Sequence, residues 1–241
     1  MLDVHPPHAP THTWRDFFTH IATITVGLLI AISLEQTVEA IDHAEQRRTL
    51  IEALREECQA NVETLEKVGE SQEARLVYLR SNLELLRVAQ PEGGAVIVQL
   101  APRAMRTPGA HSPSRSVWAA AKASGRVALL PENLTQVYDR VDFEGNQFDS
   151  YLKPRNDADL RIKYFGLRIG QEIGPGATLH LSLAQRDELA GLFSERAAIT
   201  SAQQGWGVEW NGASHAVLDG VKTREGVLKY VDRANAADDN K

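Results

Sequence analysis

The side chains best suited to chemistry in this sequence are its histidines and the carboxylates near them. Glu39 and His43 are four positions apart, so a helix would place them on one face, where they could share a metal ion. A charged helix face in water is the more ordinary explanation of that pair. The other histidine candidates are scattered along the chain: His111, His180 and His215, with His5, His8 and His12 in the amino-terminal tail. The first three could meet only through the fold. The three tail histidines could bind a metal loosely, but a solvated tail is the simpler interpretation, and we predict no metal site.

Motifs of known chemistry are absent from the sequence. It holds no GxxxxGK[ST] or GxGxxG phosphate loop, no GxSxG nucleophile elbow and no HExxH zinc helix. Its one cysteine, Cys58, rules out an intramolecular disulfide and a cysteine-based zinc site. The net charge of -6 argues against nucleic-acid binding along the whole chain. We therefore expect no catalytic residues, no cofactor and no enzyme. A hydrolase or lipid-modifying enzyme whose residues meet only in space is the less favoured alternative.

The element that organises the chain is the apolar stretch 17–34. Its 18 residues include no Asp, Glu, Lys or Arg. As a helix it would cover roughly 27 Å, close to the ~30 Å thickness of a bilayer core. We therefore predict a transmembrane helix over 13–34 in contact with the lipid bilayer. The residues expected at the membrane interface are Trp14, Arg15, Phe17 and Phe18.

Three other interpretations of this stretch stay open. It could be a buried core helix, since the apolar run is short and polar residues interrupt it. It could be a cleaved signal peptide, although Val38-Glu39-Ala40 is a poor cleavage site with acidic neighbours. It could be an interfacial amphipathic helix, but that would need a Lys/Arg-rich polar face, which the segment lacks.

Two features of the predicted span bear on assembly and orientation. Small residues recur every four positions, a pattern that lets helix backbones approach: Thr19, Thr23, Gly27 and Ala31. This predicts a possible homo-oligomer through the membrane, although small residues are common in spans. Arg15 precedes the span and acidic residues follow it, which favours a cytoplasmic tail and a periplasmic carboxyl-terminal region in a bacterial inner membrane. Counting Arg47 and Arg48 as well reverses this orientation.

The rest of the chain reads as helical. Residues 35–90 contain no proline, and their apolar positions follow steps of three, four or seven, which predicts a long juxtamembrane helix or a helical hairpin broken near Gly69. Four polar residues fall on the same stripe: Asn61, Gln72, Arg75 and Asn82. The remaining divisions are a disordered tail at 1–12, a loop at 91–115 with 95–101 as a short strand or buried loop, a helical bundle at 116–233 and a disordered tail at 234–241.

Helix boundaries inside the expected bundle are marked by local signals. Gly125 suits a helix stop, Pro131 a helix start, and Ser182 with Gln185 a capping box. The segment 91–130 carries five basic residues against one acidic residue: Arg103, Arg106, Arg115, Lys122 and Arg126 against Glu92. These could bind anions or lipid headgroups. We favour the simpler interpretation, that they neutralise the acidic long helix.

Two segments carry a resemblance to a known group of proteins. They are WRDFFTHIATITVGLLIAISLEQTVEA at 14–40 and SVWAAAKASGRVALLPENLTQVYDRV at 116–141, with Trp118, Gly125 and Pro131 as landmarks. In them the chain resembles uncharacterised bacterial single-pass membrane proteins with an N-terminal span and a helical soluble region. The resemblance implies a membrane-anchored helical protein and says nothing about a reaction.

Taken together, these patterns predict an all-α protein. A single N-terminal transmembrane helix continues into a long helix, which a small helical bundle follows. The function we expect is that of a structural or protein-interaction module of the cell envelope, with an envelope protein of unknown identity as partner. The alternative is a membrane-tethered ligand-sensing module, whose pocket would draw on Gln72, Arg75 and Asn82.

Overall fold

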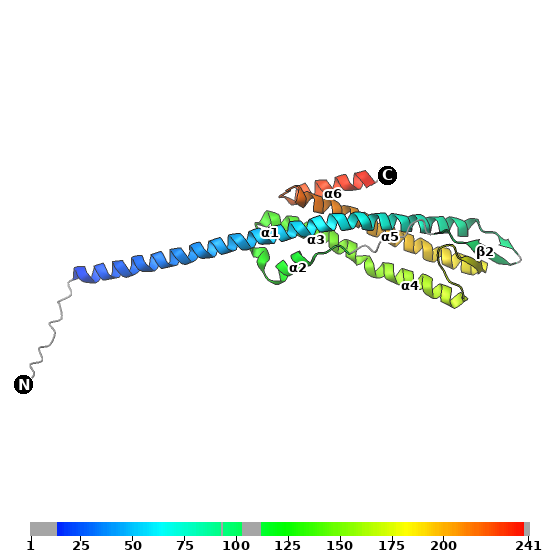
Figure 1. Cartoon of the computed structure of the whole chain (residues 1–241), viewed down its shortest axis with the longest axis horizontal. Helices are drawn as coiled ribbons and strands as arrows, with labels where there is room; N and C mark the ends of the chain where they lie inside the picture. Colours follow the sequence, from blue (N-terminus) through cyan, green and yellow to red (C-terminus); the bar gives the residue numbers. More distant parts are fainter. Residues whose placement is uncertain (1–13, 93, 103–111, 239–241) are drawn as a thin grey trace, which may run out of the picture. The chain divides into compact units, whose positions relative to one another are not determined.

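A computed structural model describes residues 14–92, 94–102 and 112–238 of the chain. The chain divides into two compact units, Met1–Thr49 and Leu50–Lys241. The predicted tail at 1–12, residues 103–111 of the predicted loop and the last three residues lie outside the described part. The described part is all-α in class, as predicted, with one small sheet (Figure 1).

Helix α1, Trp14–Val88, begins in the first unit with the apolar stretch. This helix contains an 18-residue window of mean hydropathy 2.0, of which no residue is buried. By length and composition it is able to cross a membrane, and its exposure argues against a core helix. Its hydroxyls bond within the helix: Thr19 Oγ1 donates to the Arg15 carbonyl and Thr23 Oγ1 to the Thr19 carbonyl, each at 2.9 Å. Such bonds lower the cost of placing hydroxyl groups in lipid.

The part of α1 that belongs to the second unit buries the stripe that the sequence predicts. Its buried positions are Leu50, Leu54, Cys58, Asn61, Val62, Leu65, Gln72, Leu76, Leu79, Asn82 and Leu86. The helix runs without a break past Gly69, so the hairpin considered from the sequence does not form. No residue lies within 4 Å of the position that a Cβ on Gly69 would take, so this glycine marks no close packing.

Five further α-helices follow in the described part of the second unit. They are α2 (Ser116–Ala123), α3 (Glu132–Ser150), α4 (Leu152–Ile169), α5 (Leu183–Leu218) and α6 (Arg224–Asp238). A short 3-10 turn, η1 (Arg126–Leu129), lies between α2 and α3. Gly125 stands at φ 74° before that turn, Pro131 directly precedes α3, and the Ser182–Gln185 capping box opens α5. The local signals read from the sequence therefore lie at helix boundaries.

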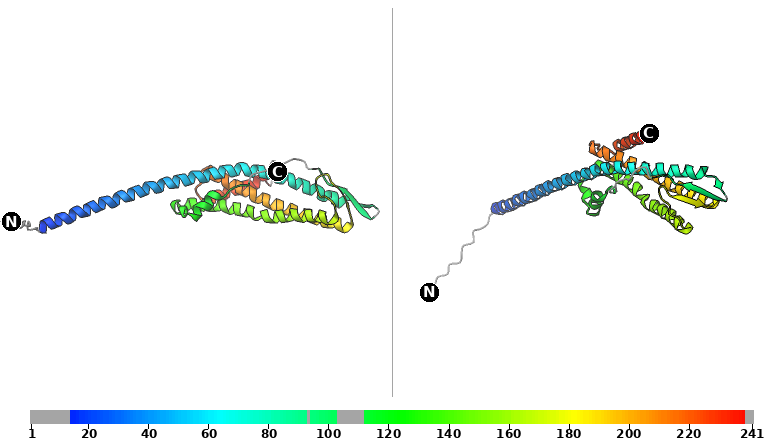
Figure 2. Two further views of the ribbon diagram at one scale, coloured as in Figure 1. Left: turned by 60° about the horizontal axis from the view of Figure 1, so that its bottom comes forward. Right: turned by 45° about the vertical axis from the view of Figure 1, so that its right-hand side comes forward.

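A three-stranded antiparallel sheet is the main feature whose strand pairing the sequence did not predict. It consists of β1 (Pro91–Glu92), β2 (Ala95–Gln99) and β3 (Thr178–Leu181), in the order β1-β2-β3. Strand β1 falls in the predicted loop, and β2 falls within 95–101, for which a short strand was one of the two alternatives. Val96 of β2 pairs with Leu181 of β3. Figure 2 shows the sheet at one end of α5 and helix α6 at the other. The carboxyl-terminal end also differs, because α6 continues to Asp238 instead of ending at residue 233.

Two hydrophobic clusters hold the second unit together. The aromatic cluster contains Trp118 and Tyr138, with ring centroids 5.6 Å apart, and Phe148 and Trp210, 5.7 Å apart. The sheet cluster joins the inward faces of β2 and β3 to α1, α4 and α5 through Val96, Leu179, Leu79, Phe165 and Phe193. The sheet cluster forms one wall of the pocket described below.

Substitution of Gly145 by alanine is expected to destabilise the second unit by about 1–3 kcal/mol. A Cβ on Gly145 would meet the Arg115 side chain and would lie 2.9 Å from Cζ2 of Trp210, whose side chain is fully buried. The measurement is chemical unfolding of the full chain in mild detergent. Gly69→Ala is the matched control in a helix, since open space surrounds that position. It should be neutral or stabilising by up to about 1 kcal/mol; equal losses for the two variants would contradict the tight packing at Gly145.

Candidate functional site

A pocket of about 1100 Å³ opens between α1, α4 and α5 in the second unit. Residues 170–175, which follow α4, close one side. The backbone there passes so near α4 that a Cβ on Gly166 would lie 2.7 Å from the Gln171 carbonyl oxygen. Gly170 ends α4 in the left-handed region, at φ 68°. The Gln171 side chain then donates to the His180 carbonyl and accepts from the His180 amide, both at 2.8 Å, which fixes the segment to β3.

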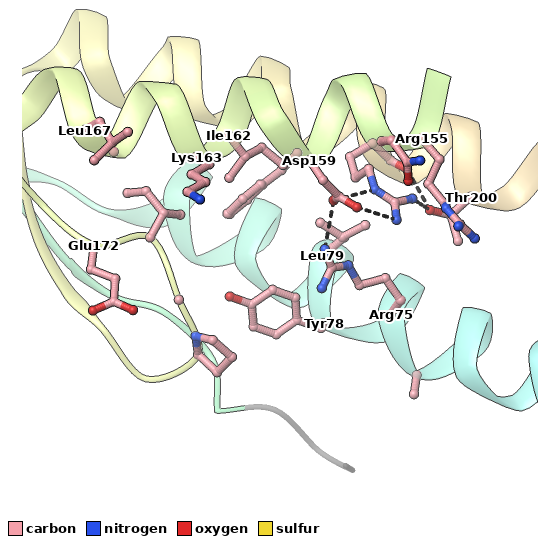
Figure 3. A pocket seen from close by; sticks show the side chains of 18 of the residues that line it. Arg75, Tyr78, Leu79, Arg155, Asp159, Ile162, Lys163, Leu167, Glu172 and Thr200 are labelled. Atoms are coloured by element: carbon pink, nitrogen blue, oxygen red, sulfur yellow. Dashed lines mark hydrogen bonds and ion pairs between the residues drawn. The ribbon is translucent and has the colours of Figure 1, made fainter. Parts of the chain in front are cut away.

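Asp159 of α4 stands at the centre of the charged end of the pocket (Figure 3). It accepts two hydrogen bonds from Arg196 of α5, from Nε at 2.7 Å and from Nη2 at 3.2 Å. Arg75 of α1 donates to the same carboxylate at 2.9 Å. Burial by itself would raise the pKa of Asp159, but the hydrogen bonds and charges of the two arginines outweigh burial and lower that pKa. The carboxylate is therefore ionised and links three helices.

The guanidinium of Arg196 is occupied by hydrogen bonds within the protein. Only 4% of the residue is exposed, and besides Asp159 its guanidinium donates to the hydroxyl of Thr200 one turn later. Its bonds to the carboxylate use two of its nitrogens in the fork geometry that arginine favours. This arginine therefore has little capacity left for a ligand.

Arg155 is the least occupied of the three arginines that line the pocket. Its closest hydrogen-bond acceptor among the described residues is Gln203 Oε1, at 3.5 Å from Nη1. Burial lowers the pKa of Arg155, and the nearby charges of Arg196 and Arg75 lower it further, against the opposing effect of Asp159. Three guanidinium groups thus surround one carboxylate, which leaves an excess of positive charge that an anion would relieve.

Two more donors in the pocket have no protein partner. Nε2 of Gln72 and Nε of Arg75 are both buried, and neither has a hydrogen-bond partner among the described residues. Gln72 is only 7% exposed and lines the pocket. An unmatched buried donor costs about 1–3 kcal/mol. The wall at the charged end of the pocket therefore holds two buried donors that the described part of the protein does not satisfy.

No family model, curated protein or solved structure matches this chain. The resemblance to bacterial single-pass membrane proteins accordingly stays a prediction. What the second unit does has to be argued from the geometry of its pocket.

The structure brings together two of the three polar residues expected to line a ligand pocket. Gln72 and Arg75 lie in the pocket. Asn82 does not: it is fully buried, donates to the Tyr78 carbonyl and accepts from the Ala101 amide, each bond being 2.8 Å long. Asn82 therefore has a structural role beside the sheet.

The charged residues on α4 and α5 were not recognised as a site from the sequence. They are Arg155, Asp159 and Arg196. One signal was present, because Arg196 occupies an apolar-stripe position between Phe193 and Ile199 on its helix. A buried stripe position held by arginine requires a partner, and the sequence did not show which one.

The other candidate chemical groups do not form sites in the described part of the chain. No group of three or more His, Cys, Asp or Glu residues that could hold a metal occurs there. His180 and His215 are exposed, and His111 lies outside the described residues. Nε2 of His43 is 4.0 Å from Oε1 of Glu39, an ordinary one-turn pairing. Cys58 is buried, and burial raises the pKa of its thiol to about 12, so it is unreactive in the folded protein.

The basic residues of 91–130 that the structure describes are used mainly within the fold. Arg115 donates to Asp142 at 2.8 Å and to Asp149 at 2.9 Å, and Lys122 donates to Asp142 at 2.6 Å. These acids belong to α3 and not to the long helix, so the partner expected from the sequence was wrong. Arg103 and Arg106 lie outside the described residues.

Proposed function

We propose that this protein is a membrane-anchored helical module of the bacterial cell envelope that binds a small anionic ligand. The observation that carries the proposal is the charged end of the pocket. Arg155 has only a 3.5 Å contact there, while Gln72 and Arg75 each present a buried donor without a protein partner. The pocket volume, about 1100 Å³, is at the upper end of the range for small-molecule sites. Of the functions considered from the sequence, this supports the ligand-sensing module.

Calorimetric titration of the full chain in phosphatidylcholine nanodiscs tests the proposal, with phenyl phosphate and inorganic phosphate as probes. At least one of them should bind with a stoichiometry of one. Arg155→Gln should weaken that binding at least tenfold, since a charged hydrogen bond is worth about 1.5–3 kcal/mol. Arg161→Gln is the matched control, because Arg161 lies on the same helix but pairs outward with Glu195 at 2.6 Å. Lack of binding by both probes, or equal binding by the Arg155 variant, would refute anion binding.

The apolar part of α1 supports membrane anchoring as a proposal. We propose a single pass through the bacterial inner membrane with the second unit in the periplasm, in keeping with Arg15 before the span and acidic residues after it. Self-association through Thr19, Thr23, Gly27 and Ala31 belongs to the same proposal. Gly27→Ile should weaken it in a membrane dimerisation reporter, whereas Leu28→Ile should not. Equal signals from the two variants would count against the small-residue contact.

A second candidate function is docking of a partner protein, which one surface feature favours. Leu160, Tyr164 and Leu167 of α4 are 46%, 62% and 67% exposed and recur at helical spacing. They form an apolar stripe on the helix that also contributes Arg155 and Asp159 to the pocket. A photo-crosslinking residue at position 164 should capture the partner in native membranes, and one at Glu132 should not. Equal labelling at both positions would remove this candidate.

A further inference from the structure

The hydrogen-bonding groups that line the pocket narrow the class of ligand further than the positive charge of the pocket does. At the charged end, three groups left over after internal pairing are donors: the Arg155 guanidinium, Nε of Arg75 and Nε2 of Gln72. Asp159, the one carboxylate there, is occupied by Arg196 and Arg75. Donors from three side chains match a group with several acceptor oxygens, such as a phosphate or a carboxylate.

The volume of the pocket is too large for such a group alone. Inorganic phosphate occupies on the order of 100 Å³, taking it as roughly three water molecules of about 30 Å³ each. The pocket measures about 1100 Å³, so most of its space would not touch a bare oxyanion. The remaining space has to suit another part of the ligand.

Apolar side chains line much of that remaining space. Ile162, Leu167 and Ile173 belong to α4 and the following segment, and Phe193 of α5, 2% exposed, also lines the pocket. Figure 3 shows Leu167 on α4 away from the cluster of Asp159, Arg155 and Arg75, with Ile162 between Leu167 and Asp159. Lys163 and Glu172, which carry opposite charges, lie near Leu167, so that end has no net preference for an anion. The pocket therefore has a cationic end at Arg155, Arg75 and Asp159 and, toward Leu167, an end lined by apolar side chains together with one charge of each sign.

We infer that the ligand is an amphiphilic organic anion, with its phosphate or carboxylate group on Arg155, Arg75 and Gln72 and an apolar body along Ile162 and Leu167. This inference rests on the proposed function and specifies its ligand class. The same chemistry is found in soluble aryl or alkyl acids and in anionic lipids. Binding by either source satisfies the inference.

The test compares phenyl phosphate with its two halves, inorganic phosphate and phenol, on the full chain in phosphatidylcholine nanodiscs. Phenyl phosphate should bind at least about tenfold more tightly than inorganic phosphate, because its ring removes apolar surface from water, and phenol should not bind measurably. Arg155→Gln should weaken both anions. Leu167→Ser should weaken phenyl phosphate and leave inorganic phosphate unchanged. Leu160→Ser is the control, since Leu160 is exposed on the same helix but does not line the pocket.

The outcomes separate the inference from the proposed function. Equal affinity for phenyl phosphate and inorganic phosphate, both lost in Arg155→Gln, would overturn the amphiphilic ligand and keep anion binding. Unchanged phenyl phosphate binding by Leu167→Ser would also overturn it, because the ring would then lie elsewhere. Absence of binding by every anion would overturn both claims. Nanodiscs that contain phosphatidate identify the source: competition with phenyl phosphate indicates a lipid ligand, and its absence indicates a soluble one.

Discussion

Replacement of Asp159 by alanine should destabilise the second unit by about 3–5 kcal/mol, because it leaves a buried cation without its partner. Arg196 is 4% exposed and gives two of its hydrogen bonds to this carboxylate. Arg75 would lose its bond to the same group and would repel Arg196 and Arg155. The measurement is urea unfolding of the full chain in mild detergent, followed by tryptophan fluorescence.

Two variants control this experiment. Asp157→Ala removes a half-exposed carboxylate from the same helix. Among the described residues Asp157 pairs only with Lys153, one turn away, so the cost should stay below about 1 kcal/mol. Arg196→Met in the Asp159→Ala background should restore much of the lost stability, since it removes the buried charge itself. If Asp159→Ala cost no more than Asp157→Ala, the three-arginine arrangement would not be a buried electrostatic centre.

Glu144 of α3 should make the stability of the second unit depend on pH. Its side chain is fully buried beside Arg140, and Glu209 lies 3.9 Å from that same arginine. Burial raises the pKa of Glu144 from its ordinary value of 4.5 to about 7, against the attraction of Arg140. Between these two values the folded protein holds a proton that the unfolded chain has released. The stabilising contribution of this group is therefore complete below pH 4.5 and lost as the pH rises through 7.

The stability that Glu144 should lose between pH 4.5 and pH 7 is large enough to measure. The difference between its pKa in the folded and unfolded protein corresponds to about 3 kcal/mol of unfolding free energy. Glu144→Gln should flatten the pH profile by that amount, as measured by urea unfolding at steps from pH 4.5 to pH 8. Glu132→Gln, at the exposed start of the same helix, should leave the profile unchanged. If the pH profile of the Glu144→Gln variant were as steep as that of the wild type, Glu144 would not be the group that makes stability depend on pH.

Much of the helical architecture could be predicted because it depends on local signals. The apolar stripe of α1 is read directly from residue spacing, and the Ser182–Gln185 capping box from four consecutive residues. The sheet could not be predicted in this way. Val96 and Leu181 pair across a large separation in sequence, and the pairing is decided by the packing of the whole unit.

Helix α5 continues through Gly205 and Gly207, although glycine weakens a helix interior. Gly207 faces α3, and a Cβ there would lie 3.4 Å from the Phe148 ring, which is an ordinary van der Waals contact.

The sequence indicated only some of the residues that line the pocket. Gln72 and Arg75 stood out because they interrupt the apolar stripe of a long helix. Their partners are on other elements: Asp159 is 84 positions from Arg75 and 37 positions from Arg196. Such spacing carries no periodic signal, and only the packing of α1 against α4 and α5 shows that these charges meet.

A structure of the full chain determined with phenyl phosphate would test the central claim most directly. We expect the phosphate group to lie within hydrogen-bond distance of the Arg155 and Arg75 guanidiniums and of the Gln72 amide. The ring should lie beside Ile162 and Leu167. A phosphate group bound away from Arg155, with the donors of Gln72 and Arg75 still unmatched, would contradict it.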